Sequence, residues 1–180
     1  MQSISPETIF RGNDAWEEAL PKISTFTKRP LILGRSSSTH ELRNKIFKDL
    51  KNQNLHPGLA NLQFDCCYED ISRVKNLILK NNYDSVVAAG GGKVLDSGKY
   101  ISESLEIPCI TVPLSASTCA GWTALSNIYT RNGQFVKDVA LRSCPKILVY
   151  EHKFIKTAPS RTLASGIADA LAKWYESSIT

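Results

Sequence analysis

Short apolar runs alternate with amphipathic stretches along most of the chain. Apolar runs bounded by Gly, Pro or polar residues are typical of buried strands, and apolar residues three and four positions apart are typical of helices. The runs predict strands at residues 30–34, 62–67, 85–89, 108–112 and 146–150, and the spacings predict helices at 39–52, 68–81 and 94–105. A shorter helix is expected at 14–20, ended or kinked by Pro21. Strands that alternate with helices predict an α/β fold, a Rossmann-like parallel sheet with helices on both faces.

Three consecutive glycines, Gly90, Gly91 and Gly92, join the predicted strand 85–89 to the predicted helix 94–105, and Lys93 follows them. Glycine lets the backbone approach a phosphate closely, and a helix N-terminus offers free N–H groups and a positive dipole end. The run matches neither the G-x-G-x-x-G pattern nor the P-loop pattern. It therefore predicts an anion cradle, and the alternative is a tight strand-to-helix turn without a ligand.

A segment of small and hydroxyl-bearing residues, 115–123, follows the predicted strand 108–112. It is expected at the carboxyl edge of the sheet, where ligands of such folds bind. Beyond it, the Asn132-Gly133 pair between residues 126–129 and 134–139 predicts a β-hairpin.

A helix is predicted from Pro159 onward, with an apolar stripe that includes Leu163, Ile167, Leu171 and Trp174. An apolar face on a helix of this length needs a packing partner. We expect residues 1–158 to form the α/β domain and residues 159–180 to be the first helix of a helical domain that the sequence lacks. The exposed stripe favours self-association, and a homo-oligomer is expected.

Composition narrows the possible function classes. The formal net charge is +5, but the basic residues are scattered, so nucleic-acid binding is not expected. The sequence has no apolar run long enough to span a membrane and no secretory signal, so we expect a cytoplasmic protein. The odd number of cysteines predicts free thiols rather than a disulfide framework. They are Cys66, Cys67, Cys109, Cys119 and Cys144, of which the first two are expected on opposite faces of the strand 62–67.

Three motifs, in order along the chain, resemble the iron-containing alcohol dehydrogenase superfamily, and its glycerol dehydrogenase branch in particular. They are Gly90-Gly91-Gly92-Lys93-x-x-Asp96-x-x-Lys99, then the run 113–129 with Ala116-Ser117-Thr118 and Ala124-Leu125-Ser126, then Ala164 to Ala172. The resemblance implies a nucleotide-binding domain followed by a helical domain, with NAD or NADP as cofactor. It also implies a divalent metal, zinc or iron, and a small alcohol or polyol as substrate, oxidised by hydride transfer.

The resemblance also assigns roles to individual residues. The cofactor-binding residues are Arg35, Gly91, Gly92, Lys93, Asp96, Ser117, Thr123, Leu125 and Tyr129, the metal ligand is Asp169, and the substrate-binding position is Cys119. Several of these assignments have a structural alternative. Asp96 is also explained as a helix N-terminal acid, Leu125 and Tyr129 as core residues, and Asp169 as a surface partner of Lys173.

The sequence departs from the family pattern at three places. The two histidine ligands of the family are missing, since His40, His56 and His152 lack ligand spacing to Asp169, so this chain alone is expected to bind a nucleotide without catalysis. Cys119 replaces an aspartate that helps to bind polyols, which puts glycerol in doubt. Arg35 replaces an aspartate of NAD-preferring relatives and favours NADP, although an exposed loop arginine is the alternative.

Two rival functions remain open from the sequence. One is a sugar-phosphate member of the same superfamily, such as a glycerol-1-phosphate dehydrogenase or a 3-dehydroquinate synthase-like protein. The other is a dinucleotide-binding module without catalysis, if the protein ends near Thr180.

Overall fold

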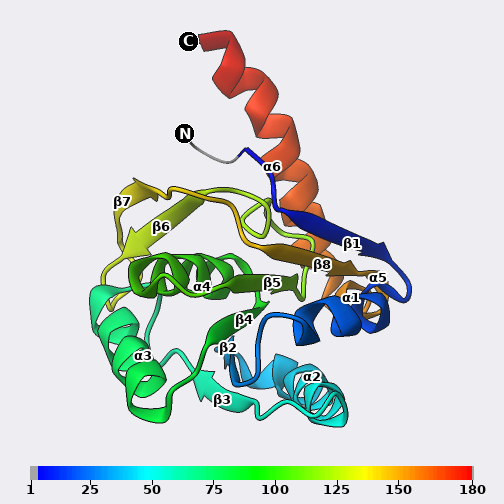
Figure 1. The fold of residues 1–180 in the computed structure, drawn as a ribbon. Helices are drawn as coiled ribbons and strands as arrows, with labels where there is room; N and C mark the ends of the chain where they lie inside the picture. Colours follow the sequence, from blue (N-terminus) through cyan, green and yellow to red (C-terminus); the bar gives the residue numbers. More distant parts are fainter. Residues whose placement is uncertain (1–3, 180) are drawn as a thin grey trace.

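The computed structural model describes residues 4–179, and its centre is a six-stranded sheet (Figure 1). The order is β1-β8-β5-β4-β2-β3, and every neighbouring pair is parallel. The strands are β1 (Thr8–Gly12), β2 (Pro30–Gly34), β3 (Gly58–Asn61), β4 (Ser85–Gly90), β5 (Cys109–Pro113) and β8 (Ile147–Glu151). Helices cover both faces, so the predicted Rossmann-like α/β fold is confirmed.

Alternate residues of the strands face two separate cores. Ile32 and Val87 join a core with α1 (Ala15–Ser24), α2 (His40–Asn52) and the short α5 (His152–Ile155). Leu31 and Val86 face the other way and pack with α3 (Tyr68–Asn81) and α4 (Gly92–Leu105). This alternation is the two-residue period of a strand. Because both faces are covered, the inner strands β2, β4 and β5 are buried along their full length, which explains why they read as continuous apolar runs.

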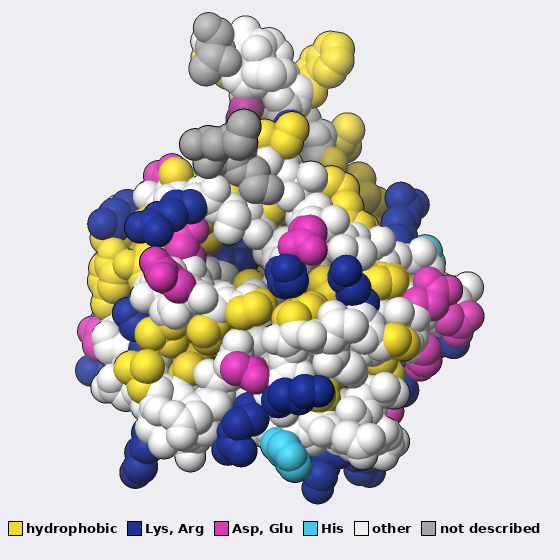
Figure 2. Space-filling model, in the orientation of Figure 1, with side chains coloured by type: hydrophobic (Ala, Val, Ile, Leu, Met, Phe, Trp, Pro, Cys, Tyr) yellow, Lys and Arg dark blue, Asp and Glu magenta, His cyan; other side chains and the backbone are white. Residues whose placement is uncertain are grey.

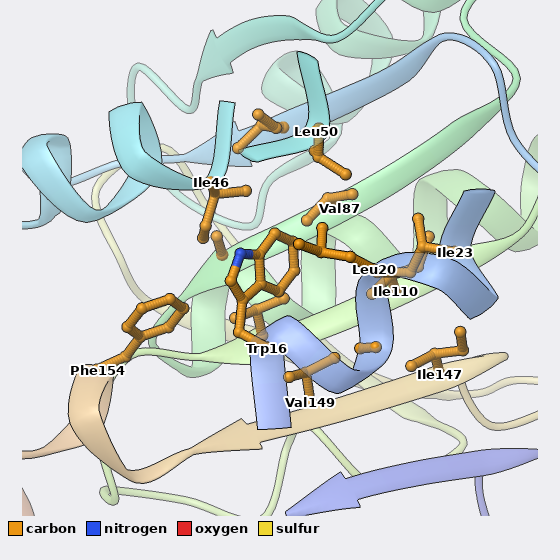
Figure 3. Close-up of a cluster of buried hydrophobic side chains, with 14 of the residues drawn as sticks. Trp16, Leu20, Ile23, Ile46, Leu50, Val87, Ile110, Ile147, Val149 and Phe154 are labelled. Carbon is orange, nitrogen blue, oxygen red and sulfur yellow. The ribbon is translucent and has the colours of Figure 1, made fainter. Parts of the chain in front are cut away.

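The first core is centred on Trp16, which α1 places against the sheet (Figure 3). Its side chain is fully buried and lies between residues of α1, residues of α2 and the sheet. The centres of the Trp16 and Phe154 rings are 6.3 Å apart. The indole Nε1 donates a hydrogen bond to Asp49 at 2.9 Å, so the one polar atom of the ring is satisfied.

Two elements lie apart from the main sheet. Strands β6 (Leu125–Tyr129) and β7 (Phe135–Ala140) form the predicted antiparallel hairpin, and Gly133 at its turn has a φ of 80°. Helix α6 (Ser160–Ile179) projects from the α/β body (Figure 1), and hydrophobic side chains lie along it (Figure 2). None of its described residues is buried, and Trp174 is 76% exposed. The division into domains at residue 158 stays a prediction.

The predicted strand at residues 62–67 is wrong. The strand there is β3, which ends at Asn61, and the following residues form bends. The reason is that carboxylates take the backbone N–H groups that a strand would offer to a neighbour: Gln63 and Phe64 donate to Asp70, and Cys66 donates to Asp65. Cys66 and Cys67 are therefore not on opposite faces of a strand, and both are buried.

Two smaller differences concern the start of the chain. Helix α1 continues through Pro21 to Ser24, because Leu20 and Ile23 on either side are buried in the core while Pro21 is exposed. Strand β1 was not predicted, because it is a half-buried edge strand of five residues beside β8. Within residues 4–179, no helix combines the length and the apolarity needed to cross a membrane.

Candidate functional site

The glycine turn forms one wall of a pocket at the carboxyl edge of the sheet. Strand β4 ends at Gly90, Gly91 is extended, and α4 begins at Gly92, two residues earlier than predicted. The first N–H groups of a helix have no acceptor in a preceding turn. In α4 the Val94 and Leu95 N–H groups donate to the Gly91 carbonyl. The N–H groups of Gly92 and Lys93 before them are therefore the ones offered to a ligand. The pocket has a volume of about 280 Å³. Its lining includes all three glycines and Lys93, which is the arrangement predicted for an anion cradle.

The opposite wall of this pocket is the loop that follows β2. Arg35, Ser36 and Thr39 line it, and β2 and β4 are neighbours in the sheet. From β2 the chain moves to β3 on one side, whereas from β4 it moves to β5 on the other. The pocket thus lies where the direction of strand order reverses, which is the usual ligand position in an open α/β sheet. We name this hollow the cradle pocket.

A buried arginine of α2 fixes the loop after β2. Arg43 is 2% exposed and donates to the Ser36 carbonyl at 3.0 Å and to the Asn61 side chain at 3.2 Å. Burial lowers the pKa of its guanidinium. Arg43 therefore ties the loop that carries Arg35 to the end of β3, and it gives the cradle pocket a fixed wall.

The two cations of the cradle pocket share one carboxylate. Lys93 Nζ contacts Asp65 Oδ2, and Arg35 Nη2 lies 3.8 Å from the same oxygen. The Asp65 side chain is only 3% exposed, whereas those of Lys93 and Arg35 are 37% and 42% exposed. Lys93 Nζ also lies 4.5 Å from the centre of the Tyr129 ring, so Tyr129 stands beside the pocket through a cation–π contact.

Asp96 does not point into the cradle pocket but into the protein. Its carboxylate pairs with Lys99 at 3.0 Å and accepts from the Asn127 N–H at 3.4 Å. Burial raises the pKa of Asp96, although Lys99 and the Asn127 N–H oppose that rise. This buried pair joins α4 to β6, and a direct contact of Asp96 with a cofactor stays a prediction.

Lys99 also places two of the predicted cofactor residues. Its Nζ donates to the Thr123 carbonyl at 3.1 Å and to the Leu125 carbonyl, so the segment before β6 is held against α4. Leu125 is 37% exposed, which speaks against the alternative that it is a core residue. The resemblance motif contains Lys99, but the sequence alone did not reveal this role.

The loop at residues 115–118 connects the cradle pocket to α6. A Cβ on Gly92 would lie 3.1 Å from Thr118 Cγ2, so this loop closes over the start of α4. On the other side of the loop, a Cβ on Gly166 would lie 1.8 Å from the Ala116 carbonyl oxygen. Helix α6 therefore packs against the loop at a position where the helix has no side chain. The predicted cofactor residue Ser117 lies between these contacts, and its Oγ is 3.1 Å from Ser115 Oγ.

A second pocket of about 510 Å³ lies between this loop, β8 and α6. Its lining contains both Cys119, predicted to bind substrate, and Asp169, predicted to bind metal. Asp169 pairs with Lys173 at 3.8 Å, as the alternative explanation of this residue expects. Among the described residues, no three His, Cys, Asp or Glu side chains come together to hold a metal ion. The donor set within residues 4–179 therefore does not fit a complete metal centre, since Asp169 supplies a single carboxylate.

Cys119 is the exposed member of the five cysteines, and all five are free thiols as predicted. We expect iodoacetamide at neutral pH to modify Cys119 first, because the other four thiols are buried. Burial also raises the pKa of Cys66 and of Cys109 to about 11, which keeps these thiols protonated. Peptide mass spectrometry measures the order of labelling. The Cys119→Ser chain should show no early adduct, and early labelling of Cys66 or Cys109 would contradict this arrangement.

Three residues at or near the site were missed by the sequence analysis: Arg43, Asp65 and Thr39. Thr39 was placed at a helix start, and Arg43 has no signal beyond its position on α2. Asp65 lies shortly after the end of β3, on the ligand edge of the sheet, but the mistaken strand at 62–67 concealed this position. The predicted residues that line the cradle pocket are Arg35, Gly91, Gly92 and Lys93.

Comparison with known proteins agrees with this geometry. The family model for iron-containing alcohol dehydrogenase matches residues 6–152. The chain is 36% identical over 179 residues to an uncharacterised oxidoreductase of Synechocystis sp., covering 99% of this chain and 46% of that protein. It is 30% identical over 172 residues to glycerol dehydrogenase of Escherichia coli, covering 96% and 47%.

Solved structures show the same likeness. The structure of glycerol dehydrogenase from Schizosaccharomyces pombe superposes with a TM-score of 0.84 at 26% identity, covering 97% of this chain and 44% of that one. The chain thus spans about half the length of these relatives. By its sequence and its fold, the chain belongs to the iron-containing alcohol dehydrogenase family.

Proposed function

We propose that this chain is the dinucleotide-binding part of an oxidoreductase that transfers hydride between NAD(P) and a small alcohol or polyol. The observation that carries this proposal is the cradle pocket, where a glycine turn, a helix N-terminus, Lys93 and Arg35 meet at the switch point of the sheet. The N–H groups of the turn and the Lys93 ammonium suit the pyrophosphate of a dinucleotide, and the Arg35 guanidinium suits a further phosphate on the adenosine ribose. Relatives named as glycerol dehydrogenases, and one named as a glycolaldehyde reductase, support the substrate class.

The family also implies a divalent metal, zinc or iron, with Asp169 as one of its ligands. In the complete protein such a metal would polarise the alcohol oxygen. The residues described here do not complete its ligand set, so we expect this chain alone to bind a dinucleotide and not to turn over an alcohol. Cys119 in the second pocket lacks the charge of a carboxylate, which favours a substrate other than glycerol. Assembly into a homo-oligomer stays a prediction.

Arg35 makes NADP the preferred cofactor in this proposal. Its half-exposed guanidinium lines the pocket beyond β2, the position from which a side chain reaches the adenosine ribose. We expect the chain to bind NADPH more tightly than NADH. Arg35→Ala should weaken NADPH binding about 10- to 100-fold, as for one charged hydrogen bond, and change NADH binding little.

Fluorescence titration with both reduced cofactors measures these affinities. Arg142→Ala is the matched control, because Arg142 lines the cavity at the other edge of the sheet, which contains the starts of β5 and β8. That variant should bind both cofactors as the wild type does. Tighter binding of NADH by the wild type would refute the NADP assignment, and binding of neither cofactor would refute the proposed function itself.

A further inference from the structure

We propose that Asp65 is a positioning residue for the dinucleotide phosphates, which acts by holding Lys93 and Arg35 at the cradle pocket. The inference rests on the proposed function and adds a residue that the family motifs above do not include. Lys93 lies in the first turn of α4 and Arg35 directly follows β2, and Lys93 Nζ and Arg35 Nη2 both meet the single oxygen Asp65 Oδ2.

The Asp65 carboxylate is itself held in a fixed place. Its other oxygen, Oδ1, accepts from the Cys66 N–H at 2.8 Å, and the Cys67 N–H donates to the Asp65 carbonyl at 2.8 Å. The next residues are anchored too, because the Tyr129 N–H donates to the Cys66 carbonyl at 2.8 Å. Asp65 thus stands on a turn that is bonded both to itself and to the β6–β7 hairpin.

The turn of the hairpin closes the other side of this cluster. A Cβ on Gly133 would lie 3.5 Å from Asp65 Oδ2 and 3.8 Å from Lys93 Nζ. Phe64 directly precedes Asp65, and the Arg131 guanidinium lies 4.0 Å from the centre of the Phe64 ring. The charged ends of Asp65 and Lys93 are therefore covered by the hairpin, and Lys93 remains open toward the cradle pocket that it lines.

Two opposite effects decide what Asp65 does to an incoming phosphate. A carboxylate near an anion weakens binding through repulsion, but Asp65 is not among the residues that line the pocket, and Lys93 and Arg35 lie between it and the ligand. A free lysine side chain must lose its rotamer freedom when it meets a phosphate, and a lysine already held by a fixed carboxylate loses less. Positioning should therefore outweigh repulsion, and removal of the Asp65 charge should weaken phosphate binding.

A double-mutant cycle with ADP as the probe tests this proposal, because ADP carries the diphosphate without the nicotinamide. We expect Asp65→Asn to weaken ADP binding about tenfold, measured by calorimetry on the whole chain. In a Lys93→Met background the same change should have less than about a twofold effect, because the partner that binds the diphosphate is already missing and ADP has no 2′-phosphate for Arg35 to bind. A role confined to fold stability would give the same loss in both backgrounds.

The matched control is Glu151→Gln, which makes the same carboxylate-to-amide change at another buried side chain. Glu151 is 1% exposed, accepts hydrogen bonds from the Trp16 and Lys153 N–H groups, and lies outside the cradle pocket. Removal of its charge should lower the melting temperature and leave the ADP affinity unchanged. A comparable loss of affinity in Glu151→Gln would show that stability alone controls binding and would overturn the proposal.

A measurement on the wild-type chain keeps the proposal testable if Asp65→Asn does not fold. The Lys93 ammonium group, assigned with Lys93→Met, should be protected from proton exchange before ADP is added, because Asp65 already holds it. A freely exchanging Lys93 ammonium, or tighter ADP binding by Asp65→Asn, would overturn the positioning role alone. A wild-type chain that binds neither ADP nor NADPH would overturn the proposed function together with this inference.

Discussion

Replacing Trp16 by alanine is expected to lower the free energy of unfolding by about 3–5 kcal/mol, the range for an aromatic residue removed from a packed core. The side chain is fully buried at the centre of the core formed by α1, α2, α5 and the sheet (Figure 3). Its loss leaves a cavity that Leu20 and Ile46 cannot fill without moving, and it removes the hydrogen bond to Asp49. This loss is a large part of the total free energy of unfolding of an ordinary domain.

Denaturant unfolding followed by circular dichroism measures this loss. Trp174→Ala is the matched control, because Trp174 is the same residue type on α6 and is 76% exposed. Its replacement should change the free energy of unfolding by no more than about 0.5 kcal/mol. Similar losses for the two tryptophans would contradict the assignment of the core to the α1 and α2 face of the sheet.

Replacing Gly91 by valine is expected to abolish most dinucleotide binding without unfolding the protein. Gly91 has a φ of −85°, which any residue adopts, and a Cβ there would lie 3.8 Å from Ser115 Oγ, an ordinary contact. The new side chain would instead occupy the cradle pocket, which Gly91 lines. The loss of one or more charged hydrogen bonds to phosphate, worth about 1.5–3 kcal/mol each, corresponds to at least a tenfold loss of affinity.

Gly98→Val makes the same change on the buried side of α4 and should have the opposite outcome. A Cβ on Gly98 would lie 2.4 Å from the Ala88 Cβ, so the helix would have to move away from β4. We expect this variant to lose stability, while Gly91→Val keeps the wild-type melting temperature. Normal cofactor affinity in a folded Gly91→Val chain would show that the ligand does not approach the glycine turn.

The strands and helices that bury their apolar residues in regular patterns were predictable from the sequence. Residues 68–81 have the helical spacing of α3, and the bounds agree with the structure. The strand prediction at residues 62–67 failed for a different reason. Leu62, Cys66 and Cys67 are buried as in a strand, but the backbone N–H groups of this segment bond to the carboxylates of Asp65 and Asp70. Burial pattern alone does not reveal where the backbone hydrogen bonds go.

The site was predictable where it depends on the local sequence. The glycines and Lys93 are consecutive, and Arg35 follows the apolar run of β2 directly, so their meeting at the carboxyl edge follows from the parallel sheet. The role of Asp65 was not predictable, because it depends on contacts with residues 30 positions before and 28 positions after it. Asp96 matched the family motif, yet its carboxylate faces Lys99 in the interior, and a motif does not specify that orientation.

Dinucleotide binding at the cradle pocket is tested most directly by adding ADP to the isotope-labelled chain and following its backbone amide signals. We expect the largest shifts at Gly90, Gly91, Gly92 and Lys93, with smaller shifts at Arg35, because these residues line one pocket. The opposite edge of the sheet, where a cavity of about 790 Å³ contains Pro108 and Lys146, should remain unchanged. Shifts confined to that opposite edge, or no shifts at all, would contradict a dinucleotide site at the glycine turn.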